Sequence, residues 1–315
     1  MSSPTSTGLL TGNSVQAEPC GSTWTANLLF YAARWALRRQ HLHSSDILRT
    51  RTKEAYRQWR RAELETQLHR HFDVATITGQ DVLDFGCGTG ELSFLLADHQ
   101  PRSVVGVDVS AEAIRSAQSV EAIASPVRDV TPTFVHTGST TPILIPDQSI
   151  DLICCFDVLE HVADVRAMLR EWHRVLRPGG RVWIWWSPWR NPYGHHLRAL
   201  IPLPWIHMVF SEKTIFDVCA QVYECPDFVP RQWDMDASTG QVKANKWRTT
   251  TSFYPFLNKL NRHEWENLLH ESGLDVHRRK THGFEGSGLR RIVRCASKLP
   301  IIGECFVSYF VYELA

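Results

Sequence analysis

Three glycines and two carboxylates mark the part of the chain best suited to hold a ligand. Glycines occupy positions 86, 88 and 90 in VLDFGCGTGELSF, residues 82–94, between an apolar run and a helical pattern. Without side chains, this loop can adopt positive φ angles and let a ligand lie against the main chain, where the amides of the helix start face it. Asp84 precedes the loop, and Asp108 ends the next apolar run. A carboxylate such as Asp108 can accept hydrogen bonds from two ribose hydroxyls, so the pattern predicts a nucleoside-containing cofactor.

The glycine spacing and the charge of Asp84 distinguish between two such cofactors. Dinucleotide-binding loops space their glycines as GxGxxG, whereas this chain has GxGxG. The Asp84 carboxylate would repel a pyrophosphate but attract an ammonium group. S-adenosylmethionine carries an adenosine at one end and an α-amino acid at the other. The sign of the charge therefore favours S-adenosylmethionine over NAD.

Strands that alternate with helices are predicted around this loop. Short apolar runs rich in Val, Ile, Phe and Trp predict strands at residues 81–85, 103–108, 133–136, 150–156 and 180–186. Helical periodicity lies between them, at residues 91–99, 110–123 and 165–176. This alternation predicts an α/β fold built from βαβ units around a mostly parallel sheet. Arg177 to Gly180 are predicted to form a tight turn that launches the fifth strand.

Outside the alternating region, composition divides the chain into further parts. The predicted parts are a flexible tail (1–22), an N-terminal helical cover (23–78), a cofactor-binding core (79–186), a substrate-binding insertion or lid (187–257) and a C-terminal part of the core sheet (258–315). The insertion is rich in proline and aromatic residues and lacks a clean period, which is typical of a lid. Its apolar residues could cover an acceptor or form core between lid and sheet, namely Trp189, Tyr193, Leu200, Ile201, Leu203, Trp205, Ile206, Met208, Val209 and Phe210. The N-terminal aromatics could complete that cover, namely Trp24, Phe30, Tyr31 and Trp35.

Charge and cysteine content narrow the classes of partner. The 34 Lys and Arg residues nearly balance the 33 Asp and Glu residues, so no global charge recruits nucleic acid. The basic stretch at residues 48–61 is interpreted as a solvated helix face rather than an anion or membrane site. The eight cysteines form no CxxC pair, Cys154 and Cys155 are not expected to bridge, and reduced thiols favour a cytoplasmic location. No run of about 18 apolar residues predicts a membrane span, and peripheral membrane contact stays open.

Four motifs together resemble a known family. VLDFGCGTG, VVGVDVS, FDVLEHV and LRPGGRVWI, in this order, resemble the class I S-adenosylmethionine-dependent methyltransferases, nearest the group that includes the quinone-ring methyltransferases. The resemblance covers residues 81–186 well and the C-terminal strands loosely. It implies a Rossmann-like, doubly wound, seven-stranded sheet of order 3-2-1-4-5-7-6 whose last strand runs antiparallel, for which CFVSYFVYEL near the C-terminus is suited. It also implies methyl transfer from S-adenosylmethionine to a small-molecule acceptor, with S-adenosylhomocysteine as product.

The resemblance also implies roles for individual residues. Asp84, Gly86, Cys87, Gly88 and Gly90 would line the methionine end of the cofactor. Asp108 would hold the ribose, with Val109 beside the adenine, and Phe156 and Asp157 would flank the cofactor near the sulfonium. After the third strand the family commonly has Gly-Asp, whose carboxylate contacts the adenine amino group. Gly138-Ser139 stands there in this chain, so Ser139 could accept one hydrogen bond in its place.

The sulfonium already activates the methyl group, so the protein must mainly align the acceptor and exclude water. An alcohol or phenol acceptor also has to lose a proton, a task that suits a histidine. His161 is the preferred candidate, ahead of His195, His196 and His207 in the insertion. Oxygen is favoured over carbon or nitrogen as the methylated atom, and an aromatic, quinone-like or lipid-like acceptor is expected.

Alternatives remain at this point both for the site and for the function. In some quinone O-methyltransferases, Glu-x-x-Glu-His is associated with a divalent cation, and Asp157, Glu160 and His161 form a similar pattern here. The prediction assigns no metal, with Glu160 exposed and Asp157 facing the cofactor. A protein that binds S-adenosylmethionine without turnover is the alternative function, with an NAD-dependent enzyme as a weaker one.

Overall fold

The structure is a computed structural model of the 315-residue chain, and it describes residues 23–43, 52–123, 129–138, 143–236, 239–283, 296–297, 299 and 302–315. One sheet dominates it, with the strand order β3-β2-β1-β4-β5-β7-β6. Its strands are β1 Asp81–Phe85, β2 Ser103–Asp108, β3 Thr133–His136, β4 Ile150–Phe156, β5 Leu176–Trp186, β6 Val276–Gly283 and β7 Val307–Leu314. The strands β1 to β5 pair in parallel, and β7 runs antiparallel to both β5 and β6. The predicted fold class and strand order are confirmed.

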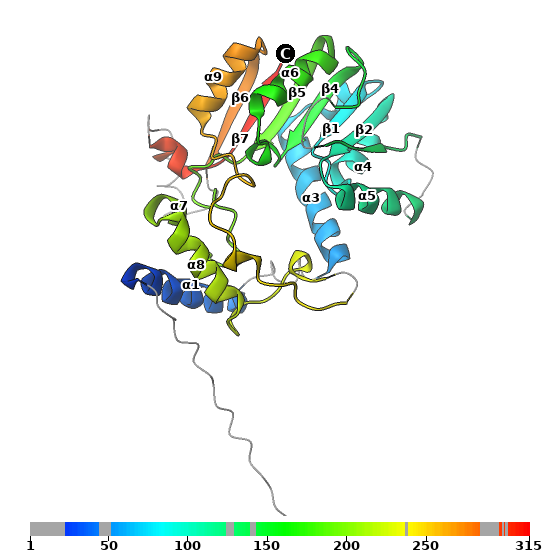
Figure 1. Cartoon of the computed structure of the whole chain (residues 1–315). Helices are drawn as coiled ribbons and strands as arrows, with labels where there is room; N and C mark the ends of the chain where they lie inside the picture. The colour runs from blue at the N-terminus through cyan, green and yellow to red at the C-terminus, as the bar shows by residue number, and fades with distance from the viewer. Residues whose placement is uncertain are drawn as a thin grey trace, which may run out of the picture.

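Strands β1, β4 and β5 form the centre of the sheet, and helices cover both of its faces (Figure 1). Because neither face meets water, such strands consist of nearly continuous apolar residues. Cys154 and Cys155 of β4 are both fully buried and neither forms a disulfide, as predicted. The continuous apolar runs in the sequence thus predict these strands from local signal alone.

Strand β5 begins earlier than its apolar run. Leu176 pairs with Ile150 and Arg181 pairs with Leu152, so residues 177–180 bulge out between the two pairs. Gly179 has a φ of 78°, which favours glycine at this point of the bulge. Arg177 Nη1 lies 2.9 Å from Asp81 Oδ2 and 2.7 Å from Asp151 Oδ2. The predicted turn therefore lies within β5, and its arginine ties the starts of β1 and β4 together.

Helices α3 (Lys53–His71) and α4 (Glu91–Ala97) pack on one face of the sheet, and α6 (Val165–Val175) and α9 (Arg262–Ser272) pack on the other. Helix α5 (Ala111–Ile123) lies along β2 and β3. Helix α9 begins with a capping box, in which Asn261 and Glu264 each bond the other's backbone N–H, and it ends at Gly273 with a φ of 76°. Gly273 therefore serves as the left-handed C-cap of α9.

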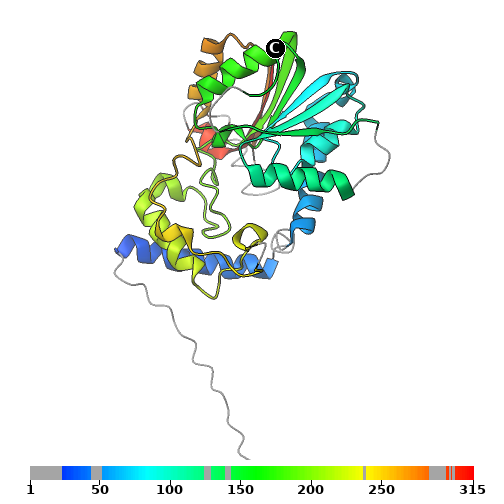
Figure 2. The same cartoon turned by 45° about the vertical axis from the view of Figure 1, so that its right-hand side comes forward.

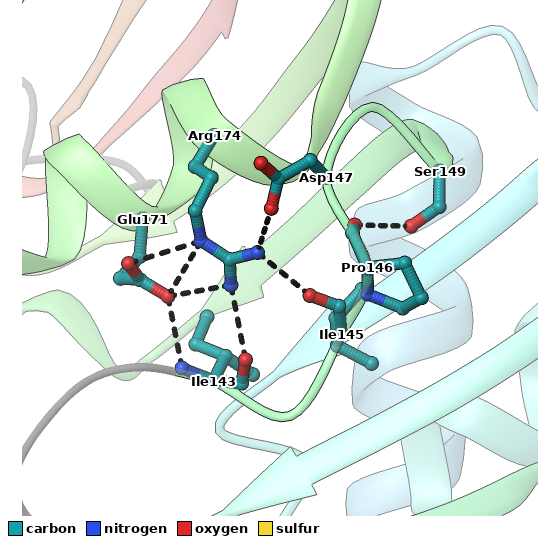
Figure 3. Close-up of polar contacts among 7 residues, drawn as sticks. All are labelled: Ile143, Ile145, Pro146, Asp147, Ser149, Glu171 and Arg174. Carbon is teal, nitrogen blue, oxygen red and sulfur yellow. Dashed lines mark hydrogen bonds and ion pairs between the residues drawn. The ribbon is translucent and has the colours of Figure 1, made fainter.

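One arginine fixes the connection that leads into β4 (Figure 3). Arg174 of α6 donates through Nη1 to the carbonyl of Ile145 at 2.8 Å and to Asp147 Oδ1 at 2.5 Å. Its Nη2 donates to the carbonyl of Ile143 at 3.0 Å and to Glu171 Oε2 at 2.7 Å. The guanidinium presents several donors in one plane, and a lysine cannot reproduce this arrangement. Arg174 thereby sets how the chain enters the central strand that carries the site.

A second apolar core lies apart from the sheet, at the opposite end of the molecule (Figures 1 and 2). It joins α1 (Trp24–His43) to the insertion, which folds into α7 (Ile206–Val209), α8 (Glu212–Tyr223) and irregular segments. Arg34 and Arg38 of α1 both bond Asp227 just after α8. Helix α1 thus packs with the insertion, while α3 packs with the sheet. In the described part of the chain, the helices are too short or too polar to cross a bilayer.

Candidate active site

The loop after β1 leaves room for a ligand beside its main chain. Gly88 has a φ of 53°, and a Cβ placed on it would meet no atom within 4 Å. Gly86, with a φ of 76°, has no such room, because a Cβ there would lie 2.5 Å from the Val158 side chain. Both positions therefore need glycine, the first for close approach of a ligand and the second for packing. The predicted loop residues Gly86, Cys87 and Gly88 line a cavity of about 270 Å³, and Gly90 caps the start of α4.

Asp84 lies in the wall of this cavity, which is the position that the charge argument requires. Its carboxyl group is buried and accepts a hydrogen bond from Ser93 Oγ at 2.5 Å. Burial raises the pKa of Asp84 to about 7, with Asp108 and Glu91 adding to the rise and the Ser93 hydrogen bond opposing it. An ammonium group brought into the cavity would favour the ionised carboxylate. Asp84 is therefore suited to bind the amino group of an amino acid.

Asp108 is the last residue of β2 and Val109 follows it; neither lines the cavity, but Asp108 bonds the glycine loop. Asp108 Oδ2 accepts a hydrogen bond from the Gly88 N–H at 2.9 Å, and Oδ1 accepts one from the Ser110 N–H at 2.7 Å. A carboxylate has about four lone-pair positions, so two hydroxyl groups can still be accepted. The Val109 side chain is 63% exposed, which leaves an apolar surface open beside this carboxylate. Ser139, predicted to contact the adenine, lies outside the described residues.

Phe156 and Asp157 end β4 and close the cavity from the opposite side. Phe156 is buried and stacks on Phe72, with ring centroids 5.4 Å apart. Asp157 has a φ of 55°, a strained value for an aspartate, and its N–H donates to the Trp185 carbonyl at 2.8 Å. Its carboxylate pairs with Arg60 Nη1 of α3 at 2.8 Å.

Helix α3 supplies cavity residues that the sequence analysis did not identify. Tyr56, Arg60 and Leu64 line the cavity with the glycine loop. Arg60 is largely buried, with its side chain 17% exposed, and pairs with Glu63 as well as Asp157. Arg57 lies 3.3 Å from Glu91 Oε1 and donates to Ser116 Oγ at 2.8 Å. The interpretation of residues 48–61 as a solvated face is therefore wrong for Arg57 and Arg60.

A larger cavity of about 750 Å³ adjoins the first, and we call it the acceptor chamber. Tyr56, Arg60 and Asp157 line both cavities, so the two meet at the end of β4. The acceptor chamber is lined by Tyr56, Trp59, Arg60, Glu63, Asp157, Glu160, His161, Ser187, His196, Arg198, Ala199, Arg231 and Trp233. Aromatic rings and charged groups therefore share this lining.

Most of the apolar residues of the insertion pack in a core instead of lining the chamber. Leu200, Ile201 and Ile206 are buried in the second apolar core with α1 and α8, and none of the ten predicted residues lines the acceptor chamber. Core is the better interpretation for the buried residues, but this core joins the insertion to α1 and does not lie between lid and sheet, and Met208 and Val209 are exposed. Among the N-terminal aromatics, Phe30 is buried there, whereas Trp24, Tyr31 and Trp35 are exposed and line neither cavity. Their expected role as a cover is wrong.

His161 lies in the acceptor chamber, in the position predicted for a base. Its Nδ1 lies 2.7 Å from the carbonyl oxygen of Phe256, an atom that can only accept a hydrogen bond. Nδ1 therefore carries the proton, and Nε2 keeps the lone pair in the neutral ring. Because the backbone fixes the tautomer, the nitrogen that can accept a proton is also fixed.

The other candidate histidines differ sharply from His161. His195 is buried with both nitrogens in backbone hydrogen bonds, and burial lowers its pKa to about 3. His207 donates to the Trp189 carbonyl at 2.7 Å and lines neither cavity. His196 does line the acceptor chamber, with its ring centroid 5.1 Å from that of His161. Burial, with His161 adding to the effect, lowers the pKa of His196 to about 4, so its ring is neutral at pH 7.

Glu160 is an unusual group in the chamber wall. It is buried, where the sequence analysis expected it exposed, and neither carboxyl oxygen has a hydrogen-bond partner among the described residues. Burial, with the neighbouring charge of Asp157, raises the pKa of Glu160 well above its ordinary value. A buried carboxyl group without a partner is costly unless it is protonated or bonds a ligand. Glu160 is therefore available to a polar group of the acceptor.

A candidate cation site lies in the chamber wall, formed by Glu160, His161 and His196. The resemblance to quinone O-methyltransferases suggests such a divalent cation. Each of the three residues offers one ligand atom within 4.8 Å of the others, and His196 Nε2 lies 3.8 Å from Glu160 Oε1. One carboxylate and two imidazoles fit a divalent transition-metal ion. Asp157, which the motif would supply, is not in this group and pairs with Arg60 instead. A cation held by the three residues would lower the pKa of an acceptor hydroxyl.

The sheet order, the glycine loop and the buried Asp84 define the core of a class I S-adenosylmethionine-dependent methyltransferase, a class whose cofactor is S-adenosylmethionine. Residues 83–184 match the family described as "Methyltransferase domain", so the chain carries a domain of this family.

Curated proteins and solved structures that are similar to the chain include the following three. A ubiquinone biosynthesis O-methyltransferase of Albidiferax ferrireducens is 34% identical over 121 residues, 36% of this chain and 43% of that protein. A trans-aconitate 2-methyltransferase of Azoarcus is 28% identical over 206 residues, 62% of this chain and 78% of that protein. A crystal structure of an S-adenosylmethionine-dependent methyltransferase from Mesorhizobium loti is 17% identical with a TM-score of 0.47, covering 79% of this chain and 95% of that one. The chain spans less than half the length of the first of these relatives.

Proposed function

We propose that the chain transfers a methyl group from S-adenosylmethionine to an oxygen of a small-molecule acceptor in the acceptor chamber. One observation carries the proposal: the cavity beside the glycine loop and the acceptor chamber share Tyr56, Arg60 and Asp157. A group bound at the end of β4 can therefore meet a molecule in the chamber without passing through solvent. S-adenosylmethionine supplies an activated methyl group, so the protein's task is to hold the acceptor oxygen in line.

The residues of the chain divide this task. Asp84 binds the amino group and Asp108 the ribose, which fixes the donor against the glycine loop. The Arg60–Asp157 pair holds the boundary between the two cavities. His161 Nε2 takes the proton of the acceptor hydroxyl, and the Phe256 carbonyl stabilises the resulting imidazolium through the hydrogen bond from Nδ1. The oxygen then forms its bond to carbon as the bond from carbon to sulfur breaks.

The chamber lining supports a ring-shaped acceptor with polar substituents. Tyr56 lies against both Trp59 and Trp233, with ring centroids 5.7 and 5.9 Å apart, so three aromatic rings form one wall. Such a wall favours a planar ring. Glu160 in its protonated form donates a hydrogen bond to an oxygen of the acceptor, a role that suits a buried carboxyl group without a protein partner. Charged residues in the same lining disfavour a purely lipid-like molecule.

Incubation of the protein with a small-molecule extract and deuterated-methyl S-adenosylmethionine, followed by mass spectrometry, tests the proposal. We expect an acceptor that gains one labelled methyl group. If S-adenosylhomocysteine binds but no labelled product forms in extracts from varied sources, the chain is the alternative, a binding protein without turnover.

Two variants, His161→Gln and a control histidine substitution, test the role of His161. We expect His161→Gln to lower kcat by about 100-fold or more, the usual contribution of a general base, with little change in S-adenosylhomocysteine binding. His270→Gln, on the exposed end of α9, is the matched control. The rate of His161→Gln should also lose the dependence on pH that the histidine imparts, which a merely structural role would not produce.

A further inference from the structure

Helix α1 buries one face and exposes an apolar face on its opposite side. Its buried residues pack in the second apolar core beside α8, namely Ala26, Leu29, Phe30, Ala33 and Leu37. Its exposed apolar residues are Trp24, Leu28, Tyr31 and Trp35, with exposures of 76%, 57%, 54% and 56%. With about 3.6 residues per turn, these four side chains lie within an arc of about 60°, and we call them the aromatic stripe. A helix that is apolar on both faces indicates a second contact surface.

The charged side chains of α1 itself are all basic. Helix α1 contains Arg34, Arg38 and Arg39 but no Asp or Glu. The Arg39 guanidinium lies over the Trp35 ring, 4.2 Å from its centroid. Arg38 follows the stripe on its other flank, and its side chain is 61% exposed although it bonds Asp227. The exposed side of α1 therefore combines apolar rings with guanidinium groups at one end.

The position of α1 leaves the stripe accessible to a flat surface. In both views α1 lies along the edge of the molecule farthest from the sheet (Figures 1 and 2). Helix α8 covers its inner side and makes its main contacts with the rest of the chain. A surface that touched the stripe would thus leave the cofactor cavity and the sheet uncovered.

We propose that α1 docks the protein on a lipid bilayer with anionic headgroups, with the aromatic stripe in the headgroup region. Trp and Tyr prefer this region, because an apolar ring and a polar N–H or O–H are both accommodated there. Arg39 and the exposed part of Arg38, on a helix that has no acidic residue of its own, complement anionic lipids. The proposal concerns an interaction surface and does not depend on the proposed methyl transfer.

Flotation of the protein with vesicles tests the proposal. Vesicles of phosphatidylcholine with about one third phosphatidylglycerol should carry the protein to the top of the gradient, and vesicles of phosphatidylcholine alone should carry roughly tenfold less. The double variant Trp24→Ala/Trp35→Ala should lose at least about tenfold in binding, because it removes two interfacial rings. Leu144→Ala/Val242→Ala removes two exposed apolar residues elsewhere and is the matched control, for which we expect unchanged binding.

Further measurements distinguish a loss of membrane binding from misfolding and from self-association of the chain. Both double variants should retain the rise in Tm caused by S-adenosylhomocysteine, which shows that the fold is intact. Arg39→Gln should weaken binding to the anionic vesicles only, and it provides a second test if the double variant fails to fold. Equal vesicle binding by wild type and Trp24→Ala/Trp35→Ala (the stripe variant) would overturn the proposal. Failure of the wild type to bind vesicles of either composition would also overturn it. A dimer in sedimentation velocity that the stripe variant abolishes would assign the stripe to a second copy of the chain and overturn it as well.

Discussion

Binding of S-adenosylhomocysteine should depend on pH through one buried carboxyl group. In the unliganded protein, burial raises the pKa of Asp84 to about 7. The ammonium group of the ligand needs the ionised carboxylate, so binding must release the proton that Asp84 holds at lower pH. Affinity should therefore rise with pH up to the pKa of Asp84 and level off above it.

The magnitude follows from the two protonation states. With a pKa of about 7, Asp84 is ionised in about one tenth of the molecules at pH 6 and about three quarters at pH 7.5. If the ammonium group brings the pKa of the bound state well below 6, Kd should fall about eightfold between these two pH values. Calorimetry in two buffers with different enthalpies of ionisation should count close to one proton released at pH 6.

The stability of the unliganded protein should also depend on the protonation of Asp84, but it should fall with rising pH where the affinity rises. The pKa of Asp84 in the folded state lies above its ordinary value of 3.8, so between pH 3.8 and 7 the folded state binds more protons than the unfolded state. The free energy of unfolding therefore decreases as pH rises through this window, by up to about 4 kcal/mol from this group alone.

The variant Asp84→Asn isolates the effect, with Asp217→Asn on the exposed side of α8 as its control. Asp84→Asn should bind S-adenosylhomocysteine weakly and with no dependence on pH between 6 and 7.5, whereas the control should behave as wild type. A flat affinity in wild type, or the same pH dependence in Asp84→Asn, would refute the assignment of the ammonium group to Asp84.

Three further predictions concern the chamber and the sheet. Because burial raises the pKa of Glu160, the folded protein loses stability as pH rises above 4.5. Glu160→Gln should therefore be more stable than wild type at pH 8 and equal to it near pH 4. Urea titrations at both pH values measure the difference. Arg174→Lys should lower the free energy of unfolding by about 2 kcal/mol, because the lysine leaves the carbonyls of Ile143 and Ile145 without their donors. Arg170→Lys, on the exposed side of the same helix, is the control and should lower the free energy of unfolding much less. Dialysis against a chelator should leave the rate unchanged, because the proposed mechanism needs no metal, and a loss that Mn²⁺ or Zn²⁺ restores would instead assign a cation to Glu160, His161 and His196.

The sequence predicts the sheet and the cofactor cavity because their signals are local. Strands buried on both faces consist of apolar runs, Asp84 lies near the end of β1, and the glycines follow this strand directly. Asp108 is the last residue of β2 and Asp157 directly follows β4, and the carboxyl ends of parallel strands meet at one edge of a sheet. Each of these residues can therefore be placed from its own neighbours in the sequence.

The acceptor chamber lacks such signals, because its residues meet only through tertiary packing. Arg60 belongs to a basic stretch that gives no indication of its pair with Asp157, far along the chain. His196 reaches His161 because the insertion folds back toward β4. Helix α8 was missed among the prolines and aromatics of the insertion, although a signal existed. Ser211 caps it, and its buried residues Ile215, Phe216, Cys219 and Val222 recur at helical spacing.

The contrast between the cofactor cavity and the acceptor chamber also explains why similar proteins indicate the cofactor more firmly than the acceptor. The family match spans residues 83–184, which include the glycine loop, Asp108 and Asp157. Much of the acceptor chamber comes from outside that range, from Tyr56 and Trp59 on α3 and from the insertion. Arg60 contributes to both cavities from outside the match, so its pair with Asp157 links the part of the site inside the family match to the part outside it. Substitutions in α3 and the insertion should accordingly change which acceptor is used while S-adenosylhomocysteine binding persists, and Arg60 is the position at which both should change together.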